Sequence, residues 1–520
     1  MGDLVVQCRR GHTHAVFNML QSSYIARDVG YYLRNHLAEK EFVPQHSERS
    51  PSGAWYQVPP RWNIKCMYTT YDRKAQKLYV PIAFCDDVIN VMEEAGAKVE
   101  VSNLRDYEPR RIPTKMRPGF TDRPKQVDPI AKCSVPEPGM KGLNLQTGGG
   151  KTYSAVRVAL NHGYATCIIV PGLVEQWIDD IEEYTDARKG KEIYKIEGFQ
   201  SLALLAEHPE YKPDFFVAST RTMQMFQKCN EGYELLPWSY KKFFEVYGIG
   251  TKIVDECHKQ FHANTMMDLH TNVPYNLYLS ATFDQTSKYA RMIFNRIFPE
   301  SMRFGGDTYD KYVTVHFYNF LGQVLERKCV RSKGYIHALY EVSLMHGNKF
   351  DSHVNTVIIP LLNQYYINNY QKGHRCLVFC STVEFATRLA KRLQQEYPHL
   401  KVSEYIAGSS KSVLDSSDLV VSTIGKSSTG LDWKGLRVCL NLVSVRSPVL
   451  TSQMLGRLRK INGEQLIYVD LCDTNISAQV RHAETRRQDL AKMAAKFYSY
   501  NGINDLSVAG GGLPPGAIAV

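Results

Sequence analysis

The sequence lacks several features that would assign it to particular classes of protein. No uninterrupted apolar run approaches the roughly 20 residues that a membrane helix needs, so we expect no membrane partner. The amino-terminal segment MGDLVVQCRRGH becomes polar before the apolar core of a signal peptide could form. We therefore expect a cytoplasmic location. Repeats of fixed period are also missing, and the Gly/Pro-rich tail 510–520 is the one low-complexity tract.

Cysteine is present, but not in the patterns of metal or disulfide proteins. The 12 cysteines form no CxxC pair and no Cys/His spacing typical of zinc. The closest two, Cys376 and Cys380, lie in the apolar run CLVFC, where both side chains can face one side of a strand. This placement favours packing in a core over metal binding or a disulfide.

Length and composition indicate a large globular protein. The 520 residues are enough for about three or four domains of ordinary size, which excludes a single small binding module. With 44% hydrophobic and 22% charged residues, the chain is close to globular averages. The 63 Lys and Arg residues exceed the 52 Asp and Glu residues by 11, a moderate excess that is compatible with a polyanion partner and weak evidence for one.

The order of patterns predicts an α/β protein of several parts. Residues 1–104 indicate a small α+β module, and the basic, proline-rich stretch that follows indicates an exposed loop. From about Gly142, short apolar runs alternate with amphipathic segments, and the alternation begins again after about Pro299. Such alternation is typical of parallel sheets with crossover helices. We expect two consecutive α/β domains, at 105–300 and 301–480, and a terminal helix with a flexible tail at 481–520.

A glycine-rich loop is the first segment that points to chemistry. Residues 146–152, QTGGGKT, lie between an apolar strand and a helix-like run. Glycines let backbone amides approach phosphates, Lys151 can reach the β- and γ-phosphates, and the Thr152 hydroxyl can bind Mg²⁺. Leu145 stands where the strict GxxxxGK[ST] pattern has its first glycine. A flexible turn is the alternative, but the strand, loop and helix order favours a phosphate site.

Two adjacent acids supply the second candidate. The apolar strand TKIV ends in Asp255 and Glu256. Asp255 can hold the Mg²⁺ of a nucleotide while Glu256 polarises the attacking water, as phosphoryl transfer requires. If no other motif were present, such a pair would be interpreted as a solvated strand end. Because a phosphate-binding loop precedes it in the sequence, the catalytic interpretation is favoured.

A third segment, QMLGRLRK at 453–460, lies in the second expected domain. A guanidinium delivered from that domain can neutralise charge on the transferred phosphoryl group. The alternative is a basic surface turn.

Taken in order, these motifs resemble those of superfamily 2 helicases of the DExH type. The set is QTGGGKT, the DECH box at 255–258, SAT at 280–282, STGLD at 428–432 and QMLGRLR at 453–459. The segment VPGLVEQWIDDIEEY, residues 170–184, is similar to phage UvsW-type branched-DNA helicases and their XPB-type relatives. Residues 68–96 resemble the small module that precedes the motor in the UvsW type.

The resemblance implies a fold, a location and a set of nucleotide contacts. The fold is two tandem RecA-like domains behind an accessory, DNA-binding domain at 1–104, and a phage-encoded chain would act in the host cytoplasm. ATP contacts are implied for Gln126, Gln146, Thr147, Gly148, Gly149, Gly150, Lys151, Thr152, Gly430 and Asp432. Catalysis is implied for Lys151, Asp255, Glu256, Arg457 and Arg459, with Mg²⁺ held by Thr152 and Asp255. The family's usual motif is QxxGRxxR, and this chain has Lys460 at the position of the second arginine, with Arg459 one position earlier. This leaves open whether Arg457 or Arg459 is the arginine finger.

The resemblance also implies residues for nucleic acid and for coupling. Contacts with the nucleic-acid backbone are implied for Pro171, Gly172, Ser219, Thr220, Arg221, Ser381, Thr382 and Thr423. Coupling of hydrolysis to strand movement is implied for His258, Ser280, Thr282 and Gln453, with His258 bridging to Gln453. Small hydroxyls and backbone amides suit phosphates better than bases, so we expect little sequence specificity.

The function implied is an ATP-dependent DNA helicase or translocase that unwinds or branch-migrates forks and Holliday junctions in recombination, replication or repair. Recombination or replication proteins are possible partners. Three alternatives stay open: an RNA helicase, a motor subunit of a nuclease or packaging complex, and a nucleic-acid-binding scaffold with a degenerate nucleotide site. The basic stretch 105–125 and the basic residues of 481–496 are either duplex contacts or ordinary solvated charge.

Overall fold

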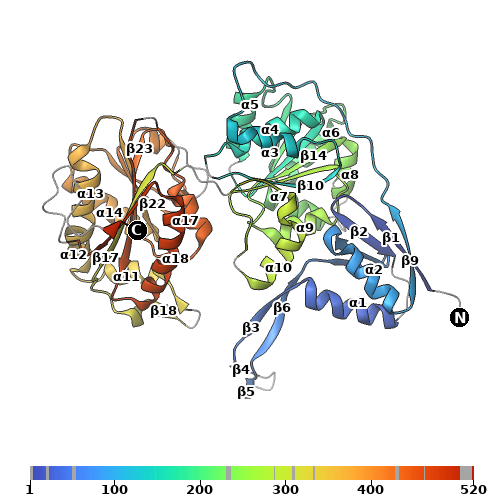
Figure 1. Cartoon of the computed structure of the whole chain (residues 1–520), viewed down its shortest axis with the longest axis horizontal. Helices are drawn as coiled ribbons and strands as arrows, with labels where there is room; N and C mark the ends of the chain where they lie inside the picture. Colours follow the sequence, from blue (N-terminus) through green and yellow to red (C-terminus); the bar gives the residue numbers. More distant parts are fainter. Residues whose placement is uncertain are drawn as a thin grey trace. The chain divides into compact units, whose positions relative to one another are not determined.

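The chain folds into two compact units, residues 1–307 and 308–520, in a computed structural model. The structure describes residues 4–18, 23–49, 54–146, 148–172, 174–229, 236–285, 287–306, 311–331, 334–410, 412–427, 433–461, 463–503 and 518–519. Figure 1 shows the course of the chain through both units. Among the described helices, none has the length and apolar character needed to span a bilayer.

The first unit begins with a small α+β module. Its five-stranded sheet has the order β7-β8-β2-β1-β9 and is mixed, because β1 pairs with β9 in parallel and with β2 antiparallel. The strands are β1 Leu4–Arg10, β2 His14–Asn18, β7 Thr70–Asp72, β8 Lys77–Pro81 and β9 Ala97–Asn103, and the helices are α1 Ser23–His36 and α2 Cys85–Glu94. The α+β class expected for 1–104 is confirmed.

A long antiparallel hairpin leaves this module between α1 and β7 (Figure 1). Its strands are β3 Ala38–Val43 paired with β6 Arg61–Met67, and β4 His46–Arg49 paired with β5 Trp55–Val58. Phe42 lies opposite Trp62, and both side chains are more than half exposed. The sequence patterns did not predict this hairpin.

A seven-stranded parallel sheet forms the rest of the first unit, in the order β12-β13-β11-β14-β15-β10-β16. The strands are β10 Gly139–Asn144, β11 Ala165–Val170, β12 Ile193–Ile196, β13 Phe215–Ser219, β14 Ile249–Val254, β15 Tyr275–Ser280 and β16 Arg303–Gly305. The helices are α3 Pro124–Cys133, α4 Lys151–His162, α5 Val174–Tyr184, α6 Gly198–Glu207, α7 Thr220–Lys228, α8 Tyr240–Val246, α9 Phe261–Asp268 and α10 Lys288–Ile297.

The central strands of this sheet are buried on both faces. Along β11, Ile168 packs with α3, α4 and α5, whereas Ile169 packs on the opposite face with α6, α7 and α8. This explains why the strand reads as a continuous apolar run rather than an alternating one. A third core joins the amino-terminal module to the sheet domain, since Phe17 and Val88 belong to the same cluster as Phe294.

The second unit is built on another parallel sheet, in the order β21-β22-β20-β23-β24-β17-β25, with β26 added antiparallel at the edge. Its strands are β17 Val313–Phe320, β20 Arg375–Cys380, β21 Val402–Tyr405, β22 Leu419–Thr423, β23 Leu436–Asn441, β24 Leu466–Asp473, β25 Lys496–Asn501 and β26 Ile518–Ala519, besides the small hairpin β18 Val330–Arg331 with β19 Gly334–Tyr335. Its helices are α11 His337–Leu344, α12 Lys349–His353, α13 Ile359–Tyr365, α14 Val383–Glu396, α15 Ser412–Asp415, α16 Ile424–Ser427, α17 Pro448–Leu455 and α18 Ser477–Met493. Cys376 and Cys380 lie together in its core.

These two parallel sheets, each covered by helices on both faces, confirm the expected fold of tandem RecA-like domains behind a small α+β module. Two boundaries differ from the sequence-based expectation. Residues 303–305 belong to the first domain, because β16 pairs with β10. Residues 481–501 are part of the second domain, because α18 packs on the sheet and β25 pairs with β17.

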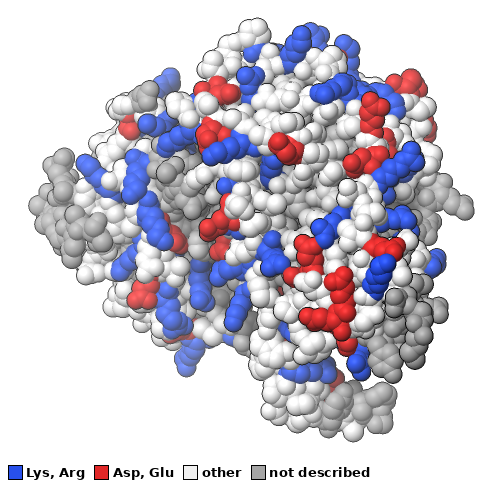
Figure 2. Space-filling view, turned by 45° about the vertical axis from the view of Figure 1, so that its right-hand side comes forward, with Lys and Arg blue, Asp and Glu red and all other residues white. Residues whose placement is uncertain are grey.

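Charge is mixed on the face that Figure 2 shows. Figure 2 shows Lys and Arg side chains interspersed with Asp and Glu side chains on the face in view. One cation of the basic carboxy-terminal stretch is not on the surface: Arg486 has no exposed area, and its guanidinium pairs with the buried Asp470 at 3.0 Å. Arg486 is therefore a core residue and not a duplex contact.

Candidate functional site

The candidate residues of the first RecA-like domain gather at one edge of its sheet. Because all seven strands are parallel, their carboxyl ends share that edge. The glycine-rich loop follows β10, the SAT motif begins at the end of β15 and the DECH box follows β14, and these are three neighbouring strands. Asn144 and Ser280 are register partners across the first two. The fold thus brings together segments more than 100 residues apart.

Glycine is required at two positions of the loop. Gly148 and Gly150 have φ angles of 85° and 79°, in the left-handed region that other residues seldom adopt. A Cβ on Gly150 would also overlap the side-chain Nε2 of Gln126. The loop then enters α4, whose first residue is Lys151.

Gln126 holds this loop from the side. It lies in the first turn of α3 and is 2% exposed. Its Nε2 donates to the carbonyl of Gly149 at 3.1 Å, and its Oε1 accepts from the amide of Arg123 at 2.9 Å. Gln126 is among the expected ATP contacts, and in the structure its side-chain amide connects the start of α3 to the glycine-rich loop.

Lys151 and Glu256 form an ion pair across the site. Lys151 Nζ lies 3.2 Å from Glu256 Oε1, and both side chains are largely buried. Burial alone would raise the pKa of Glu256, but the positive charges of Lys151 and Lys259 and the hydrogen bond from Lys151 lower it to about 2. Glu256 therefore stays ionised over the whole physiological range. Its φ angle of 46° is a left-handed conformation, which is uncommon for a residue other than glycine and is typical of functional sites.

Asp255 is held by a partner that sequence reasoning missed. Trp177, on α5, donates from its indole Nε1 to Asp255 Oδ2 at 3.0 Å, and the amide of Glu256 donates to Asp255 Oδ1 at 2.8 Å. Burial, together with the negative charge of Glu256, raises the pKa of Asp255 to about 6. The adjacent carboxyls thus have pKa values displaced in opposite directions, a pattern that separates their chemical roles.

His258 connects the DECH box to the SAT motif. Its Nδ1 lies 2.8 Å from the Ser280 hydroxyl, which donates to the carbonyl of Thr282 at 2.6 Å and accepts from the amide of Thr282 at 2.9 Å. Since the Ser280 proton is used in the second bond, His258 Nδ1 is the donor in the first. Burial lowers the pKa of His258 to about 4, so the ring is neutral. Its buried Nε2 is then an acceptor, without a partner in the described residues.

The expected nucleic-acid contacts of the first domain lie at the same sheet edge. Pro171 and Gly172 follow β11, and Ser219 caps α7 after the neighbouring strand β13, where its hydroxyl accepts from the amide of Thr222 at 3.0 Å. Thr220 is buried, whereas Arg221 is exposed. Arg221 and Gly172 are therefore the members of this set whose groups a phosphate chain can reach most directly.

In the second domain, the corresponding residues also share one edge. Cys380 and Thr423 are register partners on the adjacent strands β20 and β22, and Ser381 and Thr382 follow the first of these. Glu341, on α11 and 1% exposed, accepts from the amides of Ser381 and Thr382 at 2.6 and 2.7 Å and from the Thr382 hydroxyl at 2.7 Å. Burial raises the pKa of Glu341 to about 7. No sequence pattern indicated this buried carboxylate.

The two arginines of the basic segment after α17 differ in how exposed they are. Arg457 is 4% exposed, and its Nε donates to the carbonyl of Gln453 at 3.2 Å. Arg459 is partly exposed. Gln453 is buried, and within the described residues its Oε1 has no hydrogen-bond partner. Three further predicted nucleotide contacts, Thr147, Gly430 and Asp432, lie outside the described residues.

The residues at the first sheet edge suit a nucleotide with Mg²⁺. The glycine conformations leave the loop backbone free of side chains, the first turn of α4 presents Lys151 and Thr152, and Asp255 is a carboxylate directly after β14 of the same sheet. The Thr152 hydroxyl and the Asp255 carboxylate are oxygen ligands of the kind Mg²⁺ prefers.

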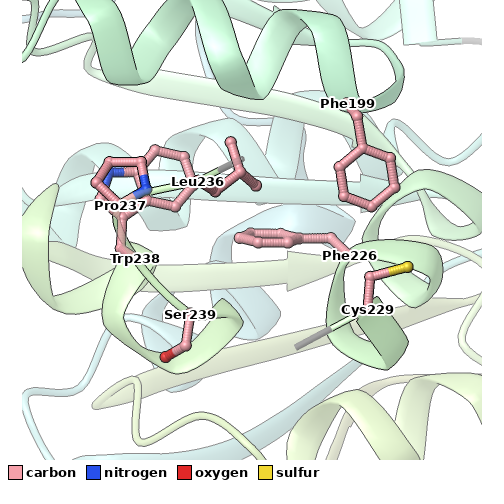
Figure 3. A pocket seen from close by; sticks show the side chains of 7 residues that line it. All are labelled: Phe199, Phe226, Cys229, Leu236, Pro237, Trp238 and Ser239. Atoms are coloured by element: carbon pink, nitrogen blue, oxygen red, sulfur yellow. The ribbon is translucent and has the colours of Figure 1, made fainter. Parts of the chain in front are cut away.

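A cavity elsewhere in this domain has a different character. It measures about 140 Å³ and lies near α6 and α7. Figure 3 shows Phe226 among the other lining side chains, which are Phe199, Cys229, Leu236, Pro237, Trp238 and Ser239. The described residues that line this cavity include no charged side chain.

Comparisons with known proteins gave no family, but they found solved structures that are similar. No family model matches the sequence, and no curated protein matches it. S. cerevisiae Dbp5 bound to RNA and ADP BeF3 is 13% identical, with a TM-score of 0.48 over 74% of this chain and 94% of that one. T4 UvsW is 14% identical, with a TM-score of 0.32 over 95% of this chain and 99% of that one. At these identities and TM-scores, the likenesses are not evidence for a shared activity.

Proposed function

We propose that the chain is an ATP-dependent nucleic-acid motor, a DNA helicase or translocase that unwinds or branch-migrates forks and Holliday junctions. One observation carries the proposal. Lys151, Glu256 and Ser280, from three separate motifs, meet at one sheet edge, where Lys151 pairs with Glu256 at 3.2 Å and Ser280 contacts His258 at 2.8 Å.

The geometry supports a sequence of steps for hydrolysis. The β- and γ-phosphates of ATP compete with Glu256 for the Lys151 ammonium, because both are anions that one cation can bind. Glu256 is then released and, being ionised, can orient the attacking water. Thr152 and Asp255 would hold Mg²⁺, which would neutralise charge on the phosphates. The Lys151–Glu256 ion pair thus keeps the catalytic carboxylate engaged until phosphate replaces it.

Hydrolysis and strand movement are coupled through His258 in this proposal. Its Nδ1 is engaged with Ser280, and its Nε2 is a buried acceptor. Gln453, in the second domain, carries an amide group that can donate to such an acceptor. We assign the arginine finger to Arg459, because Arg457 is buried and bonded within its own helix turn.

The proposed substrate is DNA, bound through its backbone. The candidate contacts are hydroxyls, a glycine and an arginine at the sheet edges, which suit phosphates and sugars and leave the bases unread. The structure of the DNA, rather than its sequence, would therefore select the substrate. The choice of branched DNA rests on the resemblance of the DECH box and of residues 170–184 to UvsW-type helicases.

A branch-migration assay tests the proposal. A synthetic four-way DNA junction is incubated with the protein and ATP beside single-stranded-tailed duplexes of DNA and of RNA, with Glu256→Gln as the control. We expect ATP-dependent dissociation of the junction that is lost in the control. Opening of tailed duplexes with an intact junction would contradict the branched-DNA assignment, and activity on RNA alone would replace DNA with RNA.

A further inference from the structure

A groove of about 890 Å³ lies within the first unit, between the amino-terminal module and the first RecA-like domain. The module contributes residues from β1, β2, β7 and β8, and the RecA-like domain contributes residues from α7, α8 and α9. The two parts share a hydrophobic core, so the walls of the groove belong to one folded body. None of the proposed catalytic residues lines it.

The groove is strongly basic. Six of its lining residues are Lys or Arg, four from the module and two from the RecA-like domain, namely Arg9, Arg73, Lys74, Lys77, Lys228 and Lys241. Five of these are exposed and Lys77 is partly exposed. In the part of the chain that the structure describes, none of the six is in an ion pair. Unpaired cations that face one groove from two sides create a positive potential that attracts anions.

Among the described residues, a single acid lines the groove, and its carboxylate is hydrogen-bonded within its own turn. Asp72 Oδ1 accepts from the amides of Lys74 and Ala75, each at 2.9 Å. The charge of the lining, counting Lys, Arg and Asp, is therefore six positive against one negative. This ratio differs from that of the whole chain, where 63 basic residues face 52 acidic ones.

Aromatic rings lie among the other lining residues of the groove. The Tyr79 ring stacks on His14 with centroids 6.1 Å apart and lies 5.2 Å from the His270 ring. Burial lowers the pKa of His14 to about 3 and also lowers that of His270. Both of these rings are neutral at physiological pH, so neither adds positive charge to the groove. A partner that combines regularly spaced anions with sugars and bases matches such a lining.

The groove continues from the proposed nucleic-acid contacts along one helix. Ser219 and Arg221 stand at the amino-terminal end of α7, and Gln224, Gln227 and Lys228 of the same helix line the groove. At a rise of about 1.5 Å per residue, α7 spans about 13 Å, which is the length of about four base pairs of duplex. The groove is therefore close enough to the sheet edge to hold one arm of a branched molecule while another of its strands lies at that edge.

We propose that this groove is a second nucleic-acid site, which binds the phosphate backbone of a DNA arm outside the motor's own contacts. The site rests on the proposed function for its role, since it would hold one arm of the branched substrate while the RecA-like domains act on another strand. It reads no sequence, because its polar groups are cations and amides suited to phosphates.

A charge-reversal variant with one change on each wall, Lys74→Glu with Lys241→Glu, tests the site. Both side chains are exposed, so the fold is preserved. The control is Lys372→Glu with Lys391→Glu, which makes the same charge change at two exposed positions of the second domain. Binding of fluorescein-labelled duplex and single-stranded DNA is measured by anisotropy at several salt concentrations without nucleotide, and ATP hydrolysis is measured without DNA.

The groove variant should bind DNA about tenfold or more weakly, and its slope of log Kd against log salt should fall by about 2, because about two phosphate contacts are lost. The control should change binding less than about twofold. A loss confined to duplex assigns the groove to a duplex arm, and a loss confined to single strands assigns it to an unpaired arm. Equal losses in the two variants, or unchanged binding in both, would overturn the site.

The ATPase readout separates this inference from the proposed function. Hydrolysis without DNA should be the same in wild type and both variants, since none of the changed residues lies in the nucleotide site. If wild type hydrolyses no ATP under any condition while the groove variant still loses DNA binding, the motor assignment fails and the groove remains a nucleic-acid site.

Discussion

Lys151 Nζ lies 3.2 Å from Glu256 Oε1, so the lysine of the glycine-rich loop is paired with the second carboxylate of the DECH box. Both residues belong to the proposed hydrolytic machinery, and each neutralises the other inside a largely buried site. Binding of ATP has to exchange this ion pair for one between Lys151 and phosphate. The pair therefore links the arrival of substrate to the release of the catalytic carboxylate.

Removal of either partner should abolish turnover for different reasons. Lys151→Ala leaves Glu256 buried without its cation and removes the phosphate ligand, so ATP binding and hydrolysis should fall together. Glu256→Gln keeps the shape of the site but removes the charge that orients water, so ATP should still bind while kcat falls by about 10² or more. Equilibrium binding of a fluorescent ATP analogue, measured beside steady-state hydrolysis, distinguishes the two. Parallel loss of binding in Glu256→Gln would argue against its catalytic role.

The pH dependence of activity should follow Asp255. Burial beside Glu256 raises the Asp255 pKa from its usual 3.8 to about 6, so the carboxyl carries a proton below that pH and its negative charge above it. A protonated Asp255 cannot hold Mg²⁺, and at limiting Mg²⁺ the rate should therefore fall as pH drops through about 6. Saturating Mg²⁺ should move the midpoint to lower pH, because the metal competes with the proton. A midpoint that does not change with the Mg²⁺ concentration would contradict this assignment.

Trp177→Phe should shift that midpoint. The indole Nε1 donates to Asp255 Oδ2 at 3.0 Å and favours the charged carboxylate. Loss of a hydrogen bond to a charged group is worth about 1.5 to 3 kcal/mol, so the midpoint should rise by about one to two pH units and the KM for Mg-ATP should increase. Trp238→Phe is the matched control, because Trp238 is also buried in this domain and does not contact Asp255. Equal pH profiles for the two variants would show that the bond does not tune the carboxyl.

Gly150→Ala should disable the nucleotide site without unfolding the domain. Gly150 has a φ of 79°, and a Cβ there would overlap the amide nitrogen of Gln126. Either the loop or Gln126 has to move, and the loop backbone then no longer fits phosphate. We expect ATP affinity to fall by about tenfold or more, at a cost in stability of about 1 kcal/mol. Gly172→Ala, where added atoms meet open space, should leave ATP binding unchanged.

Arg459→Ala and Arg457→Ala should affect the protein in different ways. Arg457 is 4% exposed and bonded to the carbonyl of Gln453, so its loss should lower the free energy of unfolding by about 1 to 3 kcal/mol. Arg459 is partly exposed, and its loss should reduce kcat with little change in Tm. Thermal denaturation and steady-state hydrolysis separate these effects. A Tm loss for Arg459→Ala together with an unchanged kcat would reverse the assignment of the finger.

Much of the fold and the first half of the site could be predicted from the sequence, because they depend on local patterns. Buried parallel strands appear as continuous apolar runs, and the chemical motifs follow directly after them, as QTGGGKT follows β10. The rest depends on contacts between distant segments. Trp177 is hydrogen-bonded to Asp255, which lies 78 residues away in the sequence, and Glu341 is hydrogen-bonded to Ser381, which lies 40 residues away.

The burial of single charged residues could not be predicted from the sequence either. Arg486 stands in a basic run that gives no sign that this one side chain pairs with Asp470 in the core. The domain boundary expected at residue 300 differs from the observed one for a related reason. Strand β16 is only three residues long, and its pairing with β10 is what assigns it to the first sheet. Pairing partners of short strands are set by the tertiary fold and not by local pattern.

The most direct test of the motor assignment is ATP hydrolysis by the purified protein, measured with and without DNA, in wild type and in Lys151→Ala. The account predicts hydrolysis that DNA stimulates by about tenfold or more in wild type, and none above background in the variant with or without DNA. Hydrolysis that is absent from wild type with every nucleic acid, or that persists in Lys151→Ala, would contradict it.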